Sequence, residues 1–182
     1  VHPVNLGKRE QFAPHFLKIS PSNKIPAIID TDNGISVFES GAILMYLAEK
    51  AGKFYPQDFT ARTRVYEWLM WQMGNFGPML GRAHYFLFYN PGKAPFAEDW
   101  FAAEAKRLYT VLDTLLEKSE FMAGEYSIAD IATFPWAARH ERQRIDLNDY
   151  PHVRRWYLAI AARPAVPKGF AVPGGNIIPM PK

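Results

Sequence analysis

Residues 22–49 read SNKIPAIIDTDNGISVFESGAILMYLAE, and this stretch decides the fold of the first part of the chain. Two short apolar runs, 26–30 and 35–38, are separated by an Asp-Asn-Gly sequence, which favours a tight β-hairpin. From Ser40 the apolar residues recur at helical spacing as far as Gly52, a residue typical of helix ends. The stretch therefore predicts a hairpin followed directly by a helix.

Pro26 stands at the start of the first apolar run, one of the few places where a strand tolerates proline. If the Ile25–Pro26 bond is cis, the N–H and C=O of Ile25 face outward and can pair with an extended peptide ligand. A cis X-Pro bond costs only about 0.5–1 kcal/mol. An ordinary trans proline at an edge strand is the commoner alternative on local sequence alone.

Glu39 and Ser40 lie where the predicted helix begins. The amides of a helix N-terminus and its dipole favour an anion such as a carboxylate, to which Ser40 can also donate its hydroxyl. Glu39 can bind a nearby ammonium group. Together the two residues would recognise an amino-acid head group that carries both charges. Simple capping of the helix is the alternative, and it is the commoner use of serine at this position.

The rest of the chain is helical in pattern. Apolar periodicity predicts long helices over 62–88 and 96–118 and a shorter one over 151–163. Ser127-Ile-Ala-Asp130 has the spacing of a capping box that opens a further helix. The expected domains are a partial α/β domain at 1–52, a linker at 53–60, an all-α domain at 61–166 and a C-terminal tail at 167–182.

Composition excludes several classes of function. The 182 residues are 48% hydrophobic, with no apolar run long enough to cross a membrane. The net charge of +3 comes from interspersed acids and bases, which indicates a solvated surface and no nucleic-acid partner. With no cysteine there is no disulfide, thiolate metal site or cysteine nucleophile, and we expect no metal. The first ten residues lack the pattern of a signal peptide, so we expect a cytoplasmic location.

The combination of motifs is more specific than any one of them. NKIPAI, a hairpin, FESGAILMYLAE, a Pro-containing linker and a helical half with a Ser-x-x-Asp cap resemble the glutathione transferase superfamily. The segments LGKREQF, SPSNKIPAI, WQMGNFGPMLG and YSIADIATFPW resemble its bacterial Nu-class, disulfide-bond-reductase-like branch. This resemblance implies a thioredoxin-like α/β N-terminal domain joined to an all-α C-terminal domain. It also implies glutathione as co-substrate, a homodimer, and a small electrophile or disulfide as second substrate.

The resemblance also implies which residues bind glutathione. We expect a cis Ile25–Pro26 bond, with Ile25 holding the cysteinyl part by backbone pairing. Glu39 and Ser40 would hold the γ-glutamyl end. Lys24 with Asn23 would lie near the glycyl carboxylate or line the groove. The complete set is Gln11, Asn23, Lys24, Ile25, Pro26, Glu39 and Ser40.

Members of this family begin with a strand and a helix, and the residue that activates the thiol lies at their junction. Residues 1–6 resemble the second strand of such a domain, so we expect the printed sequence to omit the first strand–helix unit. A shorter homologue with a rebuilt sheet edge is the alternative. No residue of the chain is assigned as the thiol activator. Two functions therefore remain: a glutathione-dependent transferase or disulfide/peroxide reductase, or a non-catalytic module that uses this fold for binding or assembly.

Overall fold

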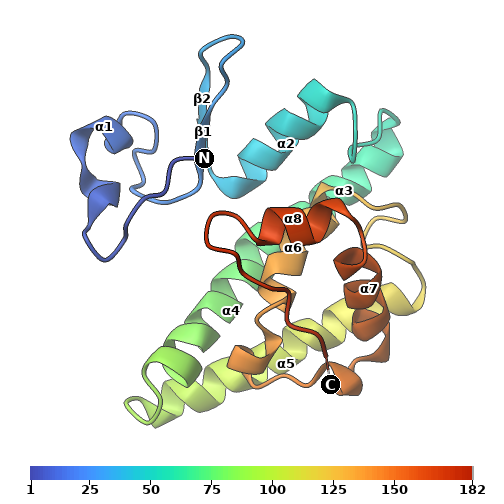
Figure 1. Cartoon of the computed structure of the whole chain (residues 1–182). Helices are drawn as coiled ribbons and strands as arrows, with labels where there is room; N and C mark the ends of the chain where they lie inside the picture. Colours follow the sequence, from blue (N-terminus) through green and yellow to red (C-terminus); the bar gives the residue numbers. More distant parts are fainter. Residues whose placement is uncertain (182) are drawn as a thin grey trace. The chain divides into compact units, whose positions relative to one another are not determined.

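The computed structural model describes residues 1–181. The chain divides into two compact units, residues 1–55 and the part that follows from Pro56 (Figure 1). We call them the hairpin unit and the helical unit and describe each by itself. Within residues 1–181, no helix combines the length and the hydropathy that crossing a membrane requires.

The centre of the hairpin unit is a two-stranded antiparallel sheet. Strand β1 (Ala27–Ile29) pairs with β2 (Ser36–Phe38), with Ala27 opposite Phe38. The predicted hairpin is confirmed, but its turn is wider than expected. Asp30 donates its N–H to the carbonyl of Ile35, and four residues close the loop between them.

Helix α2 (Ser40–Ala51) follows β2 directly, as the sequence predicts. It ends where Gly52 adopts a left-handed conformation, with φ of 62°, and donates its N–H to the carbonyls of Ala48 and Glu49. Ile43 and Ala48 are buried. The helix therefore keeps an apolar face inside while its polar residues remain accessible.

The first residues of the chain correct one expectation. Residues 1–6 are not a strand; they lead into a 3₁₀ turn, η1 (Glu10–Phe12), and a short helix, α1 (Pro14–Leu17). A strand needs backbone groups that are available for a ladder, and Pro3 has no N–H to donate. Asn5 is occupied locally, since its N–H donates to the Glu10 carboxylate at 2.7 Å and its carbonyl accepts from the Glu10 N–H.

The helical unit packs its long helices around one apolar core (Figure 1). Its elements are α3 (Phe59–Trp71), η2 (Gln72–Phe76), α4 (Gly77–Ala83), η3 (His84–Tyr89), α5 (Pro95–Glu117), α6 (Ile128–Ala137), η4 (His140–Gln143), η5 (Leu147–Asp149), α7 (Pro151–Ala161) and α8 (Ala165–Phe170). The largest fully buried side chains include Trp156, Tyr109 and Tyr157.

The helix predicted over 62–88 is helical throughout but not uniformly α. Its segments η2 and η3 are π-helical. At the first of them Gly77 donates its N–H to the carbonyl of Gln72, five residues back. Pro78 follows at once and has no N–H to continue the regular ladder. The glycines and proline of this segment thus mark a π-helical turn within the long helical stretch.

The capping box at the start of α6 is confirmed, and it reaches further than a local cap. Ser127 donates its N–H to the Asp130 carboxylate at 3.0 Å. The same carboxylate accepts from the N–H of Met122 at 3.0 Å and from Trp156 Nε1 at 2.8 Å. Burial raises the pKa of Asp130, while these donors oppose the rise. Asp130 therefore joins α6 to α7 and to the loop before α6.

Candidate functional site

The open end of the hairpin brings two predicted sites together. The ladder ends where Ala27 pairs with Phe38, so Pro26 directly precedes one strand and Glu39 directly follows the other at this end of the sheet. The Ile25–Pro26 bond is cis, as predicted. A proline-bearing backbone corner and the start of α2 thus lie at the same end of one short sheet.

Glu39 has an unusual backbone. Its φ of 67° and ψ of 118° lie in a region that residues other than glycine rarely adopt. Such conformations cost of order 1–3 kcal/mol and cluster at ligand sites. The Glu39 side chain is exposed. The conformation also turns the chain from β2 into α2 within a single residue.

The N-terminus of α2 presents its amides at this corner. The first i→i−4 bond of the helix runs from the Ile43 N–H to the Glu39 carbonyl at 2.9 Å. The amides of Gly41 and Ala42 come before that bond and point out of the helix end, where an anion is favoured. Ser40 is the first helical residue and is half-buried. Glu39 is therefore the cap residue, and Ser40 lies among the helix amides.

A folded loop supplies the residues just before the corner. Ser20 is fully buried and donates its hydroxyl to the carbonyl of Lys24 at 2.7 Å. Asn23 donates its N–H to the Ser20 carbonyl at 3.0 Å and has a left-handed φ of 51°. These bonds place Asn23, half-buried, and Lys24, exposed, immediately ahead of Ile25.

Gln11 lies in a different element, η1, and is half-buried. Among the described residues, Gln11 Oε1 and Ser22 Oγ are buried without a hydrogen-bond partner. An unpaired buried polar atom costs about 1–3 kcal/mol, so both atoms are suited to meet a polar ligand. Sequence reasoning missed Ser22, because nothing in the SPSNK segment distinguishes it from Ser20.

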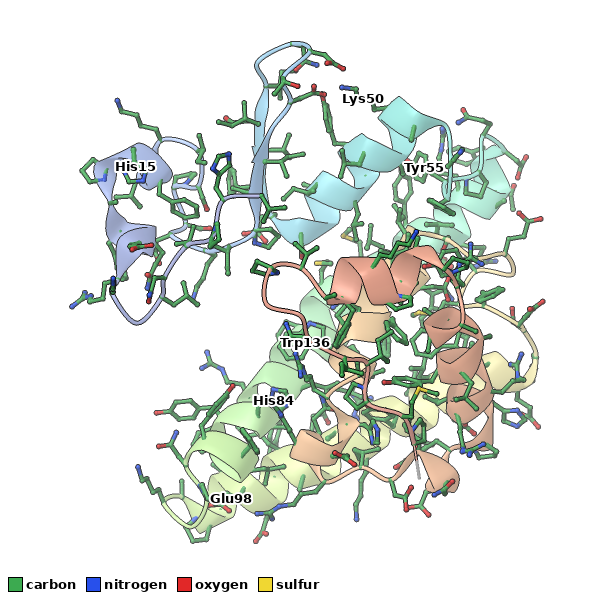
Figure 2. The ribbon with its side chains drawn as sticks, in the orientation of Figure 1. His15, Lys50, Tyr55, His84, Glu98 and Trp136 are labelled. Carbon is green, nitrogen blue, oxygen red and sulfur yellow. The ribbon has the colours of Figure 1, made fainter. Side chains whose placement is uncertain are left out.

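A polar network fastens the opposite end of the hairpin. Lys50, in the last turn of α2, contacts both oxygens of Asp30 at 2.6–2.7 Å and Asp32 at 2.6 Å (Figure 2). Tyr46, one turn earlier, donates its hydroxyl to Asp30 and accepts from the Asn33 amide. The hydrogen bonds from Lys50 and then Tyr46 lower the pKa of Asp30 to about 2. We call Asp30, Tyr46 and Lys50 the hairpin clamp.

Aromatic side chains pack against one another along the helical unit. Trp71 lies against Trp68 and Phe76, with ring centroids 5.4 and 5.1 Å away, and Phe86 stacks on Phe101 at 5.3 Å. These rings pack within the helical unit. Tyr85 is 51% exposed and Met79 half-buried, so they remain accessible.

The helical unit has a groove of about 490 Å³ between α3 and α5. It is lined by Trp68, Thr110, Val111, Thr114, Leu115, Lys118 and Ser119. Thr110 and Thr114 donate their hydroxyls to carbonyls four residues back in α5. Their polarity is thereby satisfied within the helix, and the groove is mostly apolar.

Comparison with known proteins places the chain in a family. Residues 1–49 match the profile of the glutathione S-transferase N-terminal domain, and residues 81–164 match that of the C-terminal domain. Disulfide-bond oxidoreductase YfcG of Escherichia coli is 51% identical over 89% of this chain and 78% of its own length. Disulfide-bond oxidoreductase YghU of the same organism is 42% identical over 91% of this chain and 61% of its own length.

Solved structures give the same result. A glutathione transferase from Burkholderia graminis, solved with two glutathione molecules bound per subunit, has a TM-score of 0.87 and 42% identity over 96% of this chain and 78% of its own. One from Pseudomonas putida, solved with one glutathione disulfide bound per subunit, has a TM-score of 0.88 and 40% identity over 95% of this chain and 80% of its own. The expected fold class and the disulfide-bond-reductase-like branch are confirmed. The chain belongs to the glutathione S-transferase family.

Proposed function

We propose that this protein is a glutathione-dependent transferase or disulfide/peroxide reductase that holds glutathione on its hairpin unit. The observation that carries the proposal is the antiparallel pairing of Ala27 with Phe38, because Ile25–Pro26 precedes the first residue and Glu39–Ser40 follows the second. Family membership and the ligands named for its structural neighbours support the same ligand.

The charges of the corner suit a tripeptide with one ammonium and two carboxylates. Glu39 would bind the γ-glutamyl ammonium, and Ser40 with the first amides of α2 would bind the adjoining carboxylate. The backbone of Ile25 would pair with the cysteinyl part, as in strand addition. Gln11, Asn23 and Lys24 would complete the groove, with Lys24 near the glycyl carboxylate.

The chain has no cysteine, so the reacting thiol would come from glutathione itself. In disulfide reduction, a bound glutathione thiolate attacks one sulfur of the substrate and releases the other as a thiolate, which takes up a proton. A second glutathione then attacks the mixed disulfide, giving glutathione disulfide and the second reduced thiol. In conjugation, the same thiolate would bond to an electrophilic carbon. In each case the proposed role of the named residues is to bind and orient glutathione.

We also propose that the protein works as a homodimer in the cytoplasm, where glutathione is kept reduced, and has no nucleic-acid partner. The apolar groove between α3 and α5 is a surface suited to a second copy. Leu115→Lys would place a charge there and should convert the dimer to a monomer in light scattering. The matched control is Glu117→Lys, an exposed position in the same helical turn. An unchanged molecular mass in solution for Leu115→Lys would rule out the groove between α3 and α5 as the dimer interface.

Glutathione binding and turnover test the main proposal. We expect calorimetry to detect glutathione binding, with affinity about tenfold weaker in Ser40→Ala because a charge-assisted hydrogen bond is lost. Ser36→Ala, on β2 away from the corner, should bind like the wild type. Conjugation and disulfide reduction should be assayed side by side. Binding without turnover would favour the alternative, a non-catalytic binding or assembly module. Absence of glutathione binding would reject the enzyme and leave an assembly module as the remaining alternative.

A further inference from the structure

We propose that the hairpin clamp is a positioning device: Asp30, Tyr46 and Lys50 fix the direction of α2 and thereby hold Glu39 and Ser40 in place relative to Ile25. The inference rests on the proposed function, because it concerns the γ-glutamyl end of bound glutathione. None of the three residues lies at the corner where the ligand would bind.

The sheet alone is too small to orient the helix. Each strand is three residues long, and an isolated two-stranded hairpin is marginally stable in water. Apolar packing of the hairpin contributes little to the orientation of the helix, since Ile29, Ile35 and Phe38 are 55%, 49% and 38% exposed. The direction of α2 must therefore depend on other contacts.

Besides the packing of its buried face at Ile43 and Ala48, the helix is joined to the hairpin at two separate points. The first is the covalent link at Glu39, a single residue in an uncommon conformation. The second is the clamp, which joins the last turns of α2 to the hairpin loop. Lys50 is ten residues beyond Ser40, or about 15 Å along the helix. Two attachments this far apart define the direction of a rod, whereas one leaves it free to swing.

The clamp is built to stay closed at ordinary pH. Its contacts number five hydrogen bonds among Asp30, Asp32, Asn33, Tyr46 and Lys50. The Asp30 side chain is 7% exposed, whereas those of Lys50 and Asp32 are 40% and 74% exposed, so the pairing is shielded from water mainly on the Asp30 side. Its pKa of about 2, and the raised pKa of Lys50, keep both partners charged through the neutral range. The clamp therefore acts as a fixed support and not as a switch.

Swinging of α2 would affect one end of glutathione more than the other. Glu39, Ser40 and the helix amides move with the start of α2, while the backbone of Ile25 belongs to the strand side. Binding groups must be held within about 0.5 Å of their productive position, so a small swing weakens the γ-glutamyl contacts first. Fragments of the ligand separate the two ends: γ-glutamylcysteine keeps the head group, and cysteinylglycine lacks it.

The experiment compares Lys50→Met, Tyr46→Phe and Lys50→Arg in the full chain, with Lys53→Met as a matched control on an exposed lysine outside the clamp. Binding of glutathione and of each fragment is measured by NMR titration well below the unfolding temperature. We expect Lys50→Met to weaken the binding of γ-glutamylcysteine about fivefold and that of cysteinylglycine less than about twofold, because the displaced groups are those that bind the head group. In Tyr46→Phe the ratio of the two fragment affinities should change in the same direction but by less. In Lys50→Arg this ratio should lie between those of Lys50→Met and the wild type.

If the clamp has a purely structural role, its variants should bind both fragments equally more weakly, or should show only a lower unfolding temperature. Either result would overturn the proposal. An unchanged fragment ratio in both Lys50→Met and Tyr46→Phe would overturn it as well. These outcomes leave the proposed function intact, provided that the wild type binds glutathione. Failure of the wild type to bind glutathione would instead reject the proposed function, and this inference with it.

Discussion

The two units of the molecule are stabilised in different ways. The helical unit buries large aromatic and aliphatic side chains such as Trp156, Tyr109 and Phe76. In the hairpin unit several large apolar side chains remain accessible, among them Ile25 at 48% and Leu47 at 43% exposure. Its loops and helix are joined by polar contacts instead. The comparison shows that the candidate site lies on the unit whose geometry depends on hydrogen bonds, while the other unit supplies a rigid apolar body.

The difference has a physical consequence for mutations. In an apolar core, the cost of a substitution follows the volume added or removed and the polar groups left unpaired. In a hydrogen-bonded unit, loss of one partner changes orientation at modest cost in stability. We therefore expect the largest stability effects in the helical unit and the largest binding effects in the hairpin unit. All five tryptophans belong to the helical unit, so their fluorescence reports its unfolding selectively.

Asp130→Asn should have the largest effect on stability. The carboxylate accepts from Met122, Ser127 and Trp156, and an amide can present only one oxygen to these donors. We expect a loss of about 3 kcal/mol in the free energy of unfolding, because buried charged hydrogen bonds are broken. Urea unfolding followed by tryptophan fluorescence measures it. The control is Asp99→Asn, exposed on α5; equal effects of the two variants would contradict the prediction.

A pair of glycine substitutions tests the packing of the π-helical turn. A Cβ added at Gly77 would lie 2.8 Å from Gln72 Nε2 and 3.1 Å from Trp136 Nε1. Gly77→Ala should therefore lower stability by about 2 kcal/mol through overpacking. At Gly74 a Cβ would meet no heavy atom of the described residues within 4 Å. Gly74→Ala should be neutral or stabilise by up to about 1 kcal/mol. The unfolding temperatures of both variants test this prediction. A similar shift of the unfolding temperature in each would argue against tight packing at Gly77.

The smallest effects concern pH, and they should differ between the units. Burial lowers the pKa of His84 below its ordinary 6.5, so the unfolded chain binds this proton more readily than the folded one. The helical unit should lose stability as pH falls below about 6.5, and His84→Gln should reduce that loss. The lowered pKa of Asp30 stabilises the hairpin unit above pH 3.8, and this contribution disappears as pH falls toward 2.

Tryptophan fluorescence and the NMR signals of the hairpin unit, recorded between pH 7.5 and pH 2 in increasing urea, follow the two transitions separately. If both units unfold at the same urea concentration at every pH, their stabilities do not depend on pH in different ways, and the prediction is contradicted. An Asp30→Asn variant provides the control for the acid transition, because it removes the titrating group.

Much of the fold follows from local sequence. The end of α2 at Gly52 and the cap formed by Ser127 and Asp130 each depend on a few neighbouring residues, and both predictions are confirmed. The cis bond before Pro26 is also confirmed, but local sequence alone favoured a trans bond, and the family resemblance implied the cis form. The expected strand at residues 1–6 was wrong, because alternation of side chains does not supply a ladder partner. The π-helical segments were also missed, since glycine and proline mark an interrupted helix without fixing how many residues its turn contains.

The site was predictable in its parts but not in its assembly. Sequence patterns indicated Ile25–Pro26 and Glu39–Ser40 as separate features, and the register of β1 with β2 is what brings them to one corner. The clamp could not be predicted at all. Lys50 and Asp30 are twenty residues apart, and their pairing depends on how the helix lies on the hairpin.

The π-helical turn at Gln72–Phe76 also has an evolutionary consequence. Such a turn holds one residue more than an α-helical turn, so it is equivalent to a single-residue insertion that the helix has absorbed. Each residue of an α-helix advances by about 100° around the axis. In a regular α-helix an inserted or deleted residue would rotate the side chains on one side by this angle, but the π-helical turn takes up the extra residue locally. Deleting Gly74 should therefore return the turn to α-helical geometry and leave the exposed face of α3 in the same orientation relative to Tyr85.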